Sequence, residues 1–165
     1  MEKILYSRRS VREFSDKEVA NDLLLKIIDA GIKAPSAKNQ QPWEFIVVDD
    51  KNLLDKISEN GSPLYAKCNK AIILCFKNYG LKTPHMVIQD MGACCENMLL
   101  MATSLGIGSC WIGTYPHEDR RQNLRQCLNI PDNLEPFCAI VLGYPAKDDA
   151  FKEVSRTAKV YYNRF

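Results

Sequence analysis

The sequence predicts an α+β protein, and three of its features support this fold class. Apolar residues recur at helical spacing near the start of the chain, from Val19 to Ile32. Two short runs, residues 71–76 and 137–142, are apolar almost throughout, as is typical of strands buried on both faces. A longer segment, residues 86–105, is apolar on nearly every helical face. Helices and strands are therefore expected to alternate around a shared core.

Each predicted element has its own start or stop signal. Ser15 followed by Glu18 is a capping-box pattern, so a helix is expected over about residues 17–33. Pro35 and Pro42 bracket a polar loop that leads into a strand at residues 44–48. A short helix around residues 53–57 ends at Asn60-Gly61, and Gly106 ends the helix over residues 86–105. The remaining elements are a strand at residues 109–113, a helix at residues 117–128, and a tail over residues 150–165 that is too aromatic for a solvated extension. The tail is expected to pack on another surface, such as that of a partner subunit.

Composition limits the protein class. A chain of 165 residues with 46% hydrophobic and 25% charged residues suits one globular domain over residues 1–165. A net charge of +2 gives no general attraction to nucleic acid or to an anionic membrane. Charges within the first five residues interrupt any signal peptide, and no apolar stretch is long enough for a membrane span, so a cytoplasmic location is expected. Seven cysteines without disulfide-framework spacing indicate reduced thiols.

Two polar segments are candidates for ligand binding. Arg8, Arg9, Ser10 and Arg12 place three guanidinium groups and a hydroxyl within five residues, enough donors to bind a phosphate. The alternative is a solvated basic stretch at a helix end. The loop over residues 35–43 is rich in amide and hydroxyl groups that could contact a planar heterocycle, or it could be an ordinary surface loop.

The glycine-rich segment over residues 105–113 allows a close approach between backbone and ligand. These glycines follow a helix and precede a strand, which is the reverse of the order in a dinucleotide-binding fingerprint. Structural turn glycines are the alternative. No metal site is predicted, because His85 and His117 lack ligands at suitable spacing. Cys94 and Cys95 are adjacent on a predicted helix, point in different directions, and are interpreted as core residues.

Taken in order, these segments resemble the nitroreductase family over essentially the whole chain. The first half contributes Arg8-Arg9-Ser10-Val11-Arg12, Ala34-Pro35-Ser36 and Asn39-Gln40-Gln41-Pro42-Trp43. The stretch from Asp90 to Trp111 is similar to the central helix and following strand of that family. The chain resembles a short member of that family, because it lacks sequence between residues 51 and 71 and between residues 77 and 85 that longer relatives use over the substrate pocket.

The resemblance implies an α+β fold with a mainly antiparallel sheet, bound FMN, and a homodimer whose two active sites lie at the subunit interface. A homodimer fits the predicted helix that is apolar all round. Matching the motifs position by position implies a set of FMN contacts. These are Arg8, Arg9, Ser10 and Arg12 at the phosphate, ribityl chain and flavin edge; Pro35, Ser36 and Asn39 from the loop; the backbones of Ile112 and Gly113; and Arg156 as a second phosphate contact.

The implied activity passes electrons from NAD(P)H through FMN to a nitroaromatic, quinone or similar acceptor by a ping-pong mechanism. No side chain is expected to act as acid, base or nucleophile, because the flavin carries the redox chemistry. An FMN-binding or flavin-storage protein with little turnover is the alternative. Binding of nucleic acid through the arginines of residues 8–12 and 120–125 is not supported, since charge is balanced and no binding motif is present.

Overall fold

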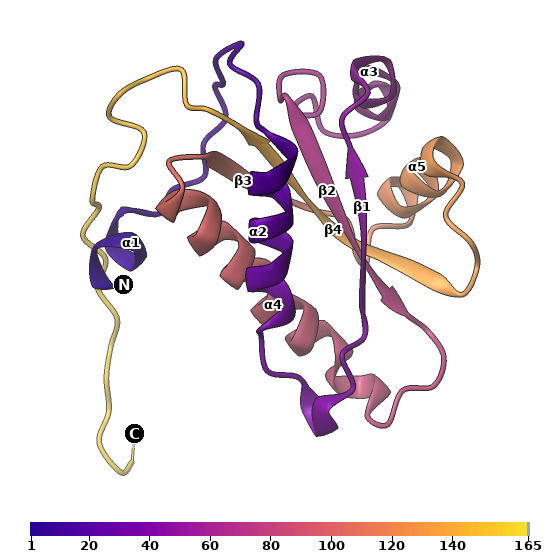
Figure 1. Ribbon diagram of the computed structural model, residues 1–165. Helices are drawn as coiled ribbons and strands as arrows, with labels where there is room; N and C mark the ends of the chain where they lie inside the picture. Colours follow the sequence, from indigo (N-terminus) through magenta and orange to yellow (C-terminus); the bar gives the residue numbers. More distant parts are fainter. Residues whose placement is uncertain (165) are drawn as a thin grey trace.

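The computed structural model describes residues 1–164 and contains a four-stranded antiparallel sheet with helices on both faces (Figure 1). The strands are β1 (Trp43–Val48), β2 (Lys70–Lys77), β3 (Gly108–Gly113) and β4 (Leu134–Gly143), in the order β1-β2-β4-β3. The two central strands, β2 and β4, are buried along almost their whole length. This burial explains their continuous apolar sequence, and the predicted α+β class is confirmed.

Each face of the sheet has its own apolar core. Ile72 and Leu74 of β2 face α2 (Asn21–Ile32) and α4 (Val87–Ser104), whereas Ala71 and Ile73 face α3 (Lys51–Glu59) and α5 (Glu118–Leu128). Neighbouring residues of one strand therefore serve opposite cores, as the pleat of a strand requires.

Helices α2 and α4 pack side by side on one face of the sheet (Figure 1). Their close approach depends on Gly31, because a Cβ at this position would lie 2.7 Å from Cγ of Met98. Met98 itself has no exposed surface. The centre of α4 therefore belongs to the core of this protomer.

The outer side of α4 is only partly covered by this chain. Ile88 is 37% exposed, and Gly92 and Leu100 are half-buried. No atom of the described residues lies within 4 Å of the position that a Cβ of Gly92 would occupy. Burial all round, which the sequence predicts for this helix, is therefore not provided by one protomer.

Local signals explain where several helices begin and end. Asp50 caps α3, its Oδ1 accepting a hydrogen bond from the backbone N–H of Asn52 at 2.8 Å. Helix α5 ends at Asn129, which adopts the left-handed conformation with φ 51°. Gly106, with φ 72°, follows α4 as predicted. Single turns of 3₁₀ helix occur at Ala37–Asn39 (η1) and Pro84–Met86 (η2).

The predicted start of α2 is wrong. The helix begins at Asn21, and its N-cap, Ala20, makes no side-chain capping bond. Ser15 instead donates its backbone N–H to the carbonyl of Tyr144 at 2.8 Å, and Glu18 pairs with the buried Lys70 at 3.5 Å. Both residues of the expected capping box are thus used to attach the preceding segment to the sheet.

The two terminal segments of the chain lie side by side. Helix α1 (Glu2–Ser7), which the sequence did not predict, lies beside the tail that follows β4 (Figure 1). Residues 152–164 form no helix or strand and are exposed, while Phe165 lies outside the described residues. Residues of the tail and of α1 line the same surface hollows. Within residues 1–164, no helix combines the length and apolarity needed to cross a membrane.

Candidate functional site

The segment after α1 runs along the outer edge of β3. Val11 donates its backbone N–H to the carbonyl of Ser109 at 2.9 Å, next to a parallel bridge between Ser10 and Ser109. A Cβ on Gly108 would lie 2.8 Å from Cγ1 of Val11, so the glycine is needed for this contact. The predicted binding residues Ser10 and Arg12 are thereby held beside the glycine-rich strand.

Three arginines from opposite ends of the chain line one surface hollow of about 360 Å³, which we call the arginine hollow. Arg8 and Arg9 enter it from the end of α1 and Arg156 from the tail. Arg8 pairs through its Nε with Oε1 of Glu96 at 3.2 Å, and Nη1 of Arg9 donates to the carbonyl of Tyr6 at 2.9 Å. The structure thus brings together three of the arginines predicted to contact FMN.

Arg9 has unused hydrogen-bonding capacity at this hollow. Its Nε and Nη2 are buried, and neither has a hydrogen-bond partner among the described residues. A buried guanidinium with unpaired donors is unfavourable, and an anion would satisfy these donors. The arginine hollow therefore fits a phosphate group.

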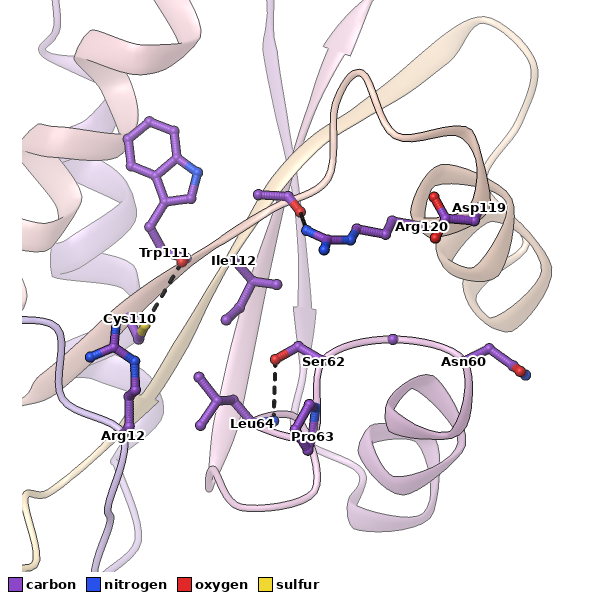
Figure 2. Close-up of a pocket in the computed structure, with 12 residues that line it drawn as sticks. Arg12, Asn60, Ser62, Pro63, Leu64, Cys110, Trp111, Ile112, Asp119 and Arg120 are labelled. Atoms are coloured by element: carbon purple, nitrogen blue, oxygen red, sulfur yellow. Dashed lines mark hydrogen bonds between the residues drawn. The ribbon is translucent and has the colours of Figure 1, made fainter.

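A second depression, the edge cleft, lies beside β3 and has a volume of about 500 Å³ (Figure 2). Arg12 bounds it at one end and Arg120 of α5 at the other, and Leu64 lies between them. The size is that of a typical cofactor pocket. The full lining comprises Arg12, residues 60–64, residues 110–113, Asp119 and Arg120.

The backbone of β3 presents hydrogen-bonding groups to the edge cleft. The carbonyls of Ser109 and Gly113 point away from β4, since they accept from Val11 N at 2.9 Å and from Arg120 Nη1 at 2.8 Å. Carbonyls two residues apart in a strand point to the same side, so the Trp111 carbonyl, which accepts a weak hydrogen bond from Sγ of Cys110 at 3.7 Å, also points away from β4. No described strand pairs with this edge. The space beside Gly113 where a Cβ would stand is open. A planar heterocycle could therefore approach the Trp111 and Gly113 backbone closely.

Part of this cleft is not evident from the sequence. Residues 60–64 and Asp119 were not predicted as site residues, and the arginines of α5 were considered for nucleic-acid binding, which the sequence does not support. Arg120 instead binds the carbonyl of Gly113, and Arg121 and Arg125 both pair with Glu135 at the start of β4. The available signal was the short distance in sequence between Gly113 and α5, which keeps the first turn of the helix near the strand.

The Ser36–Gln41 loop, with Pro35 before it, is not part of the edge cleft. It follows α2 and lies beside the start of α4, at the opposite end of the molecule from β3 (Figure 1). Lys38, Asn39 and Gln41 have φ values of 52°, 51° and 44°, and such conformations cost of the order of 1–3 kcal/mol in strained sites. Ser36 Oγ and Asn39 Oδ1 each accept from Gln41, both at 3.0 Å. Within one protomer, the structure therefore separates Pro35, Ser36 and Asn39 from the other predicted contacts.

The sequence matches the family described as "Nitroreductase family" over residues 5–60 and 59–144. The chain belongs to the nitroreductase family. It is 43% identical over 154 residues to a nitroreductase-family relative from Archaeoglobus fulgidus, provisionally named NADH dehydrogenase/NAD(P)H nitroreductase; the match covers 92% of this chain and 88% of the relative. The family is one of oxidoreductases, so this chain is an enzyme of that class.

Solved structures of nitroreductases show the same fold. A protein of Clostridium acetobutylicum, provisionally described as an NADH oxidase, superposes with a TM-score of 0.93 at 36% identity and covers 98% of this chain and 99% of its own. An FMN-dependent nitroreductase from Clostridium difficile R20291 gives a TM-score of 0.88 at 30% identity, with 100% of both chains covered. The nitroreductase-like fold expected from the sequence is thus confirmed.

Burial makes three thiols of this nitroreductase-family chain, those of Cys94, Cys95 and Cys110, harder to ionise. Burial raises the pKa of Cys94 to about 12 and also raises the pKa of Cys95. Burial likewise raises the pKa of Cys110 in the edge cleft, although the Arg12 charge and a hydrogen bond with Ser10 act in the opposite direction. These thiols are therefore protonated near neutral pH and are weak nucleophiles.

Proposed function

We propose that the chain binds FMN, with its phosphate in the arginine hollow and its ring in the edge cleft, and uses it as an NAD(P)H-dependent oxidoreductase. The observation that carries this proposal is the convergence of Arg8, Arg9 and Arg156 on one hollow, together with the unpaired donors of Arg9. An FMN-dependent nitroreductase among the structural neighbours supports it. We infer that residues 1–165 form one flavin-binding domain.

Bound FMN would supply the redox chemistry, accepting a hydride from NAD(P)H and passing electrons to a nitroaromatic, quinone or similar acceptor in a ping-pong cycle. The role of the protein is then to bind and orient. Arg12 brings positive charge to the end of the edge cleft, where it favours a ligand that gains negative charge on reduction. Ile112 and Gly113 offer their backbone, and Arg120 fixes the carbonyl of Gly113.

The site becomes complete only with a second copy of the chain. Pro35, Ser36 and Asn39 lie away from the edge cleft of their own protomer, so a contact between them and the same flavin must come from a partner subunit. The partly covered outer side of α4 offers a surface for that partner. We therefore propose a homodimer with two composite sites.

Cofactor identity tests the proposed function directly. We expect purified protein to be yellow or to become yellow with added FMN, and to release FMN rather than FAD on denaturation. Steady-state oxidation of NAD(P)H with a quinone or nitroaromatic then distinguishes an oxidoreductase from a flavin-storage protein. A colourless protein that fails to bind added FMN would rule out the proposal.

The dimer is tested by Gly92→Leu. The protomer has open space at this position and leucine favours a helix, so the fold should remain intact or become slightly more stable. A second α4 approaching this side would meet the added side chain, and we expect dimerisation to weaken by about tenfold or more, equivalent to 1.4 kcal/mol. Sedimentation equilibrium measures this, with Gly92→Ala as the small control. Equal association of the leucine variant and the parent would place the interface elsewhere.

The absence of a catalytic side chain is tested on the thiols. Cys94→Ala, Cys95→Ala and Cys110→Ala, made one at a time, are expected to keep turnover per bound FMN within about tenfold of the parent, a barrier change below about 1.4 kcal/mol. The physical reason is that these groups are buried and protonated. Abolished turnover with full FMN occupancy in any one variant would show that its thiol takes part in the reaction.

A further inference from the structure

The Ser36–Gln41 loop is anchored by a carboxylate that is only 5% exposed, that of Asp90 in the first turn of α4. Its Oδ1 accepts a hydrogen bond from the backbone N–H of Ala37 at 2.9 Å. Its Oδ2 accepts from Nε2 of Gln40 at 2.6 Å. One side chain of α4 thus holds both ends of the single 3₁₀ turn in the loop.

Gln40 extends this anchor to the segment before η2. Its Nε2 also donates to the carbonyl of Thr83 at 3.3 Å, and its Oε1 accepts both the backbone N–H and the hydroxyl of Thr83 at 3.1 Å. All four hydrogen-bonding positions of the amide are therefore used. The carboxylate of Asp90 can only accept and the N–H of Thr83 can only donate, so the amide has one permitted orientation.

The loop needs an external anchor because its backbone is strained. Lys38, Asn39 and Gln41 all have positive φ values. Such conformations persist where the surrounding structure over-determines them, and they concentrate at ligand sites. The side-chain bonds within the loop, from Gln41 to Ser36 and Asn39, are exposed to solvent, whereas the Asp90 contacts are partly buried and the Asp90 side chain itself is buried. Asp90 and Gln40 thus restrain the loop from its more buried side.

We propose that Asp90 and Gln40 are positioning residues that hold Ser36 and Asn39 in the conformation that contacts FMN in the site of a second copy. This inference rests on the proposed function. Neither residue needs to touch the flavin, because both act through the backbone and amide contacts that set the loop. Their loss is expected to weaken FMN binding although the arginine hollow and the edge cleft stay intact.

A pair of isosteric exchanges tests the proposal. Asp90→Asn replaces one of two acceptor oxygens by an NH₂, which must face either the NH₂ of Gln40 or the backbone N–H of Ala37, so one donor-to-donor mismatch results. Gln40→Glu sets a carboxylate against that of Asp90, where the parent has a bond of 2.6 Å. The double variant restores a donor facing an acceptor between the two side chains, but it replaces the bond to the Thr83 carbonyl with a contact between two acceptors. We expect each single variant to bind FMN about tenfold more weakly or worse, and the double variant to bind more tightly than either.

FMN affinity is measured by quenching of flavin fluorescence on titration with the apoprotein, with Asp22→Asn, an exposed carboxylate paired with Lys26 on α2, as the matched control. Hydrogen exchange at the amides of Ala37 and Gln41 in the apoprotein reports on the loop without any cofactor, and thermal unfolding reports on the global fold. Faster exchange in the single variants, reversed in the double variant and parallel to FMN affinity, supports the proposal.

Two outcomes separate failure of the positioning role from failure of the proposed FMN binding. If the parent binds FMN but both single variants bind it as tightly as the parent, or the losses simply add in the double variant, Asp90 and Gln40 do not position the loop for the cofactor. If the parent itself binds no FMN, the proposed function fails, and the positioning role for FMN fails with it.

Discussion

The Met98→Asp substitution is expected to prevent the chain from reaching its native fold. Met98 has no exposed surface and lies in the core between α2, α4 and the sheet, where it packs against Gly31. Among the described residues no cation lies in this core cluster, so a carboxylate there is buried without a partner. Such changes cost more than about 4 kcal/mol, a large part of the 5–15 kcal/mol that stabilises a domain.

The measurement is thermal or denaturant unfolding of the purified variant, together with its soluble yield. Met98→Leu is the matched control, because a volume-conserving exchange in a core costs less than about 1.5 kcal/mol. If the helix were apolar all round because it lies at a dimer interface, as the sequence suggests, this substitution would act through subunit association. The structure locates the primary damage inside the protomer, so loss of the dimer and of FMN should follow from loss of the fold. A well-folded monomeric Met98→Asp variant would contradict this account.

Arg8→Ala is expected to weaken FMN binding by about ten- to a hundredfold. Arg8 lines the arginine hollow, and removing one charge-assisted hydrogen bond costs about 1.5–3 kcal/mol. The side chain is 25% exposed, and the protomer core does not include it, so the fold should persist. Fluorescence titration with FMN gives the affinity, and circular dichroism verifies the fold.

The ion pair between Arg8 and Glu96 supplies the control for this prediction. Glu96→Gln removes the partner of Arg8 but keeps its guanidinium, which becomes more available to an anion. FMN affinity should then stay the same or increase. If Glu96→Gln weakened FMN as much as Arg8→Ala, the role of Arg8 would be to attach the N-terminal segment to α4, and the phosphate would be bound without it.

Much of the fold could be predicted because strong patterns coincide with buried elements. The apolar run at residues 71–76 lies within β2, and the long apolar segment corresponds to α4 with an error of about one residue at each end. The six-residue helix α1 was missed because it buries no residue and therefore leaves no periodic pattern. The start of α2 was misplaced because Ser15 and Glu18 bind the sheet and Lys70, contacts that local sequence does not reveal.

The candidate site shows a different limit. The resemblance to the family implied that Arg8 and Arg156 both contact the FMN phosphate, and in the structure both residues line the arginine hollow. The same resemblance implied that Asn39 and Gly113 contact one flavin, yet Gly113 lines the edge cleft and Asn39 does not. A family pattern does not tell which subunit supplies which residue. The contact between Arg120 and the Gly113 carbonyl could not be predicted, because it depends on how α5 is rotated against β3. The charge pattern of the sequence does not report that tertiary relationship.

Helix α4 contacts both the Ser36–Gln41 loop and Arg8, two segments that are proposed to bind FMN. Asp90 holds the Ser36–Gln41 loop and Glu96 holds Arg8, and these two carboxylates lie less than two helical turns apart. In the proposed dimer, the loop of one subunit contacts one FMN and Arg8 of the same subunit contacts the other FMN. A ligand that shifts α4 at one site therefore also alters the contacts at the second site. Linkage requires this influence to be equal in both directions. Binding of FMN at one site of the dimer is therefore expected to change the affinity of the other site. The FMN binding isotherm should then depart from a simple hyperbola.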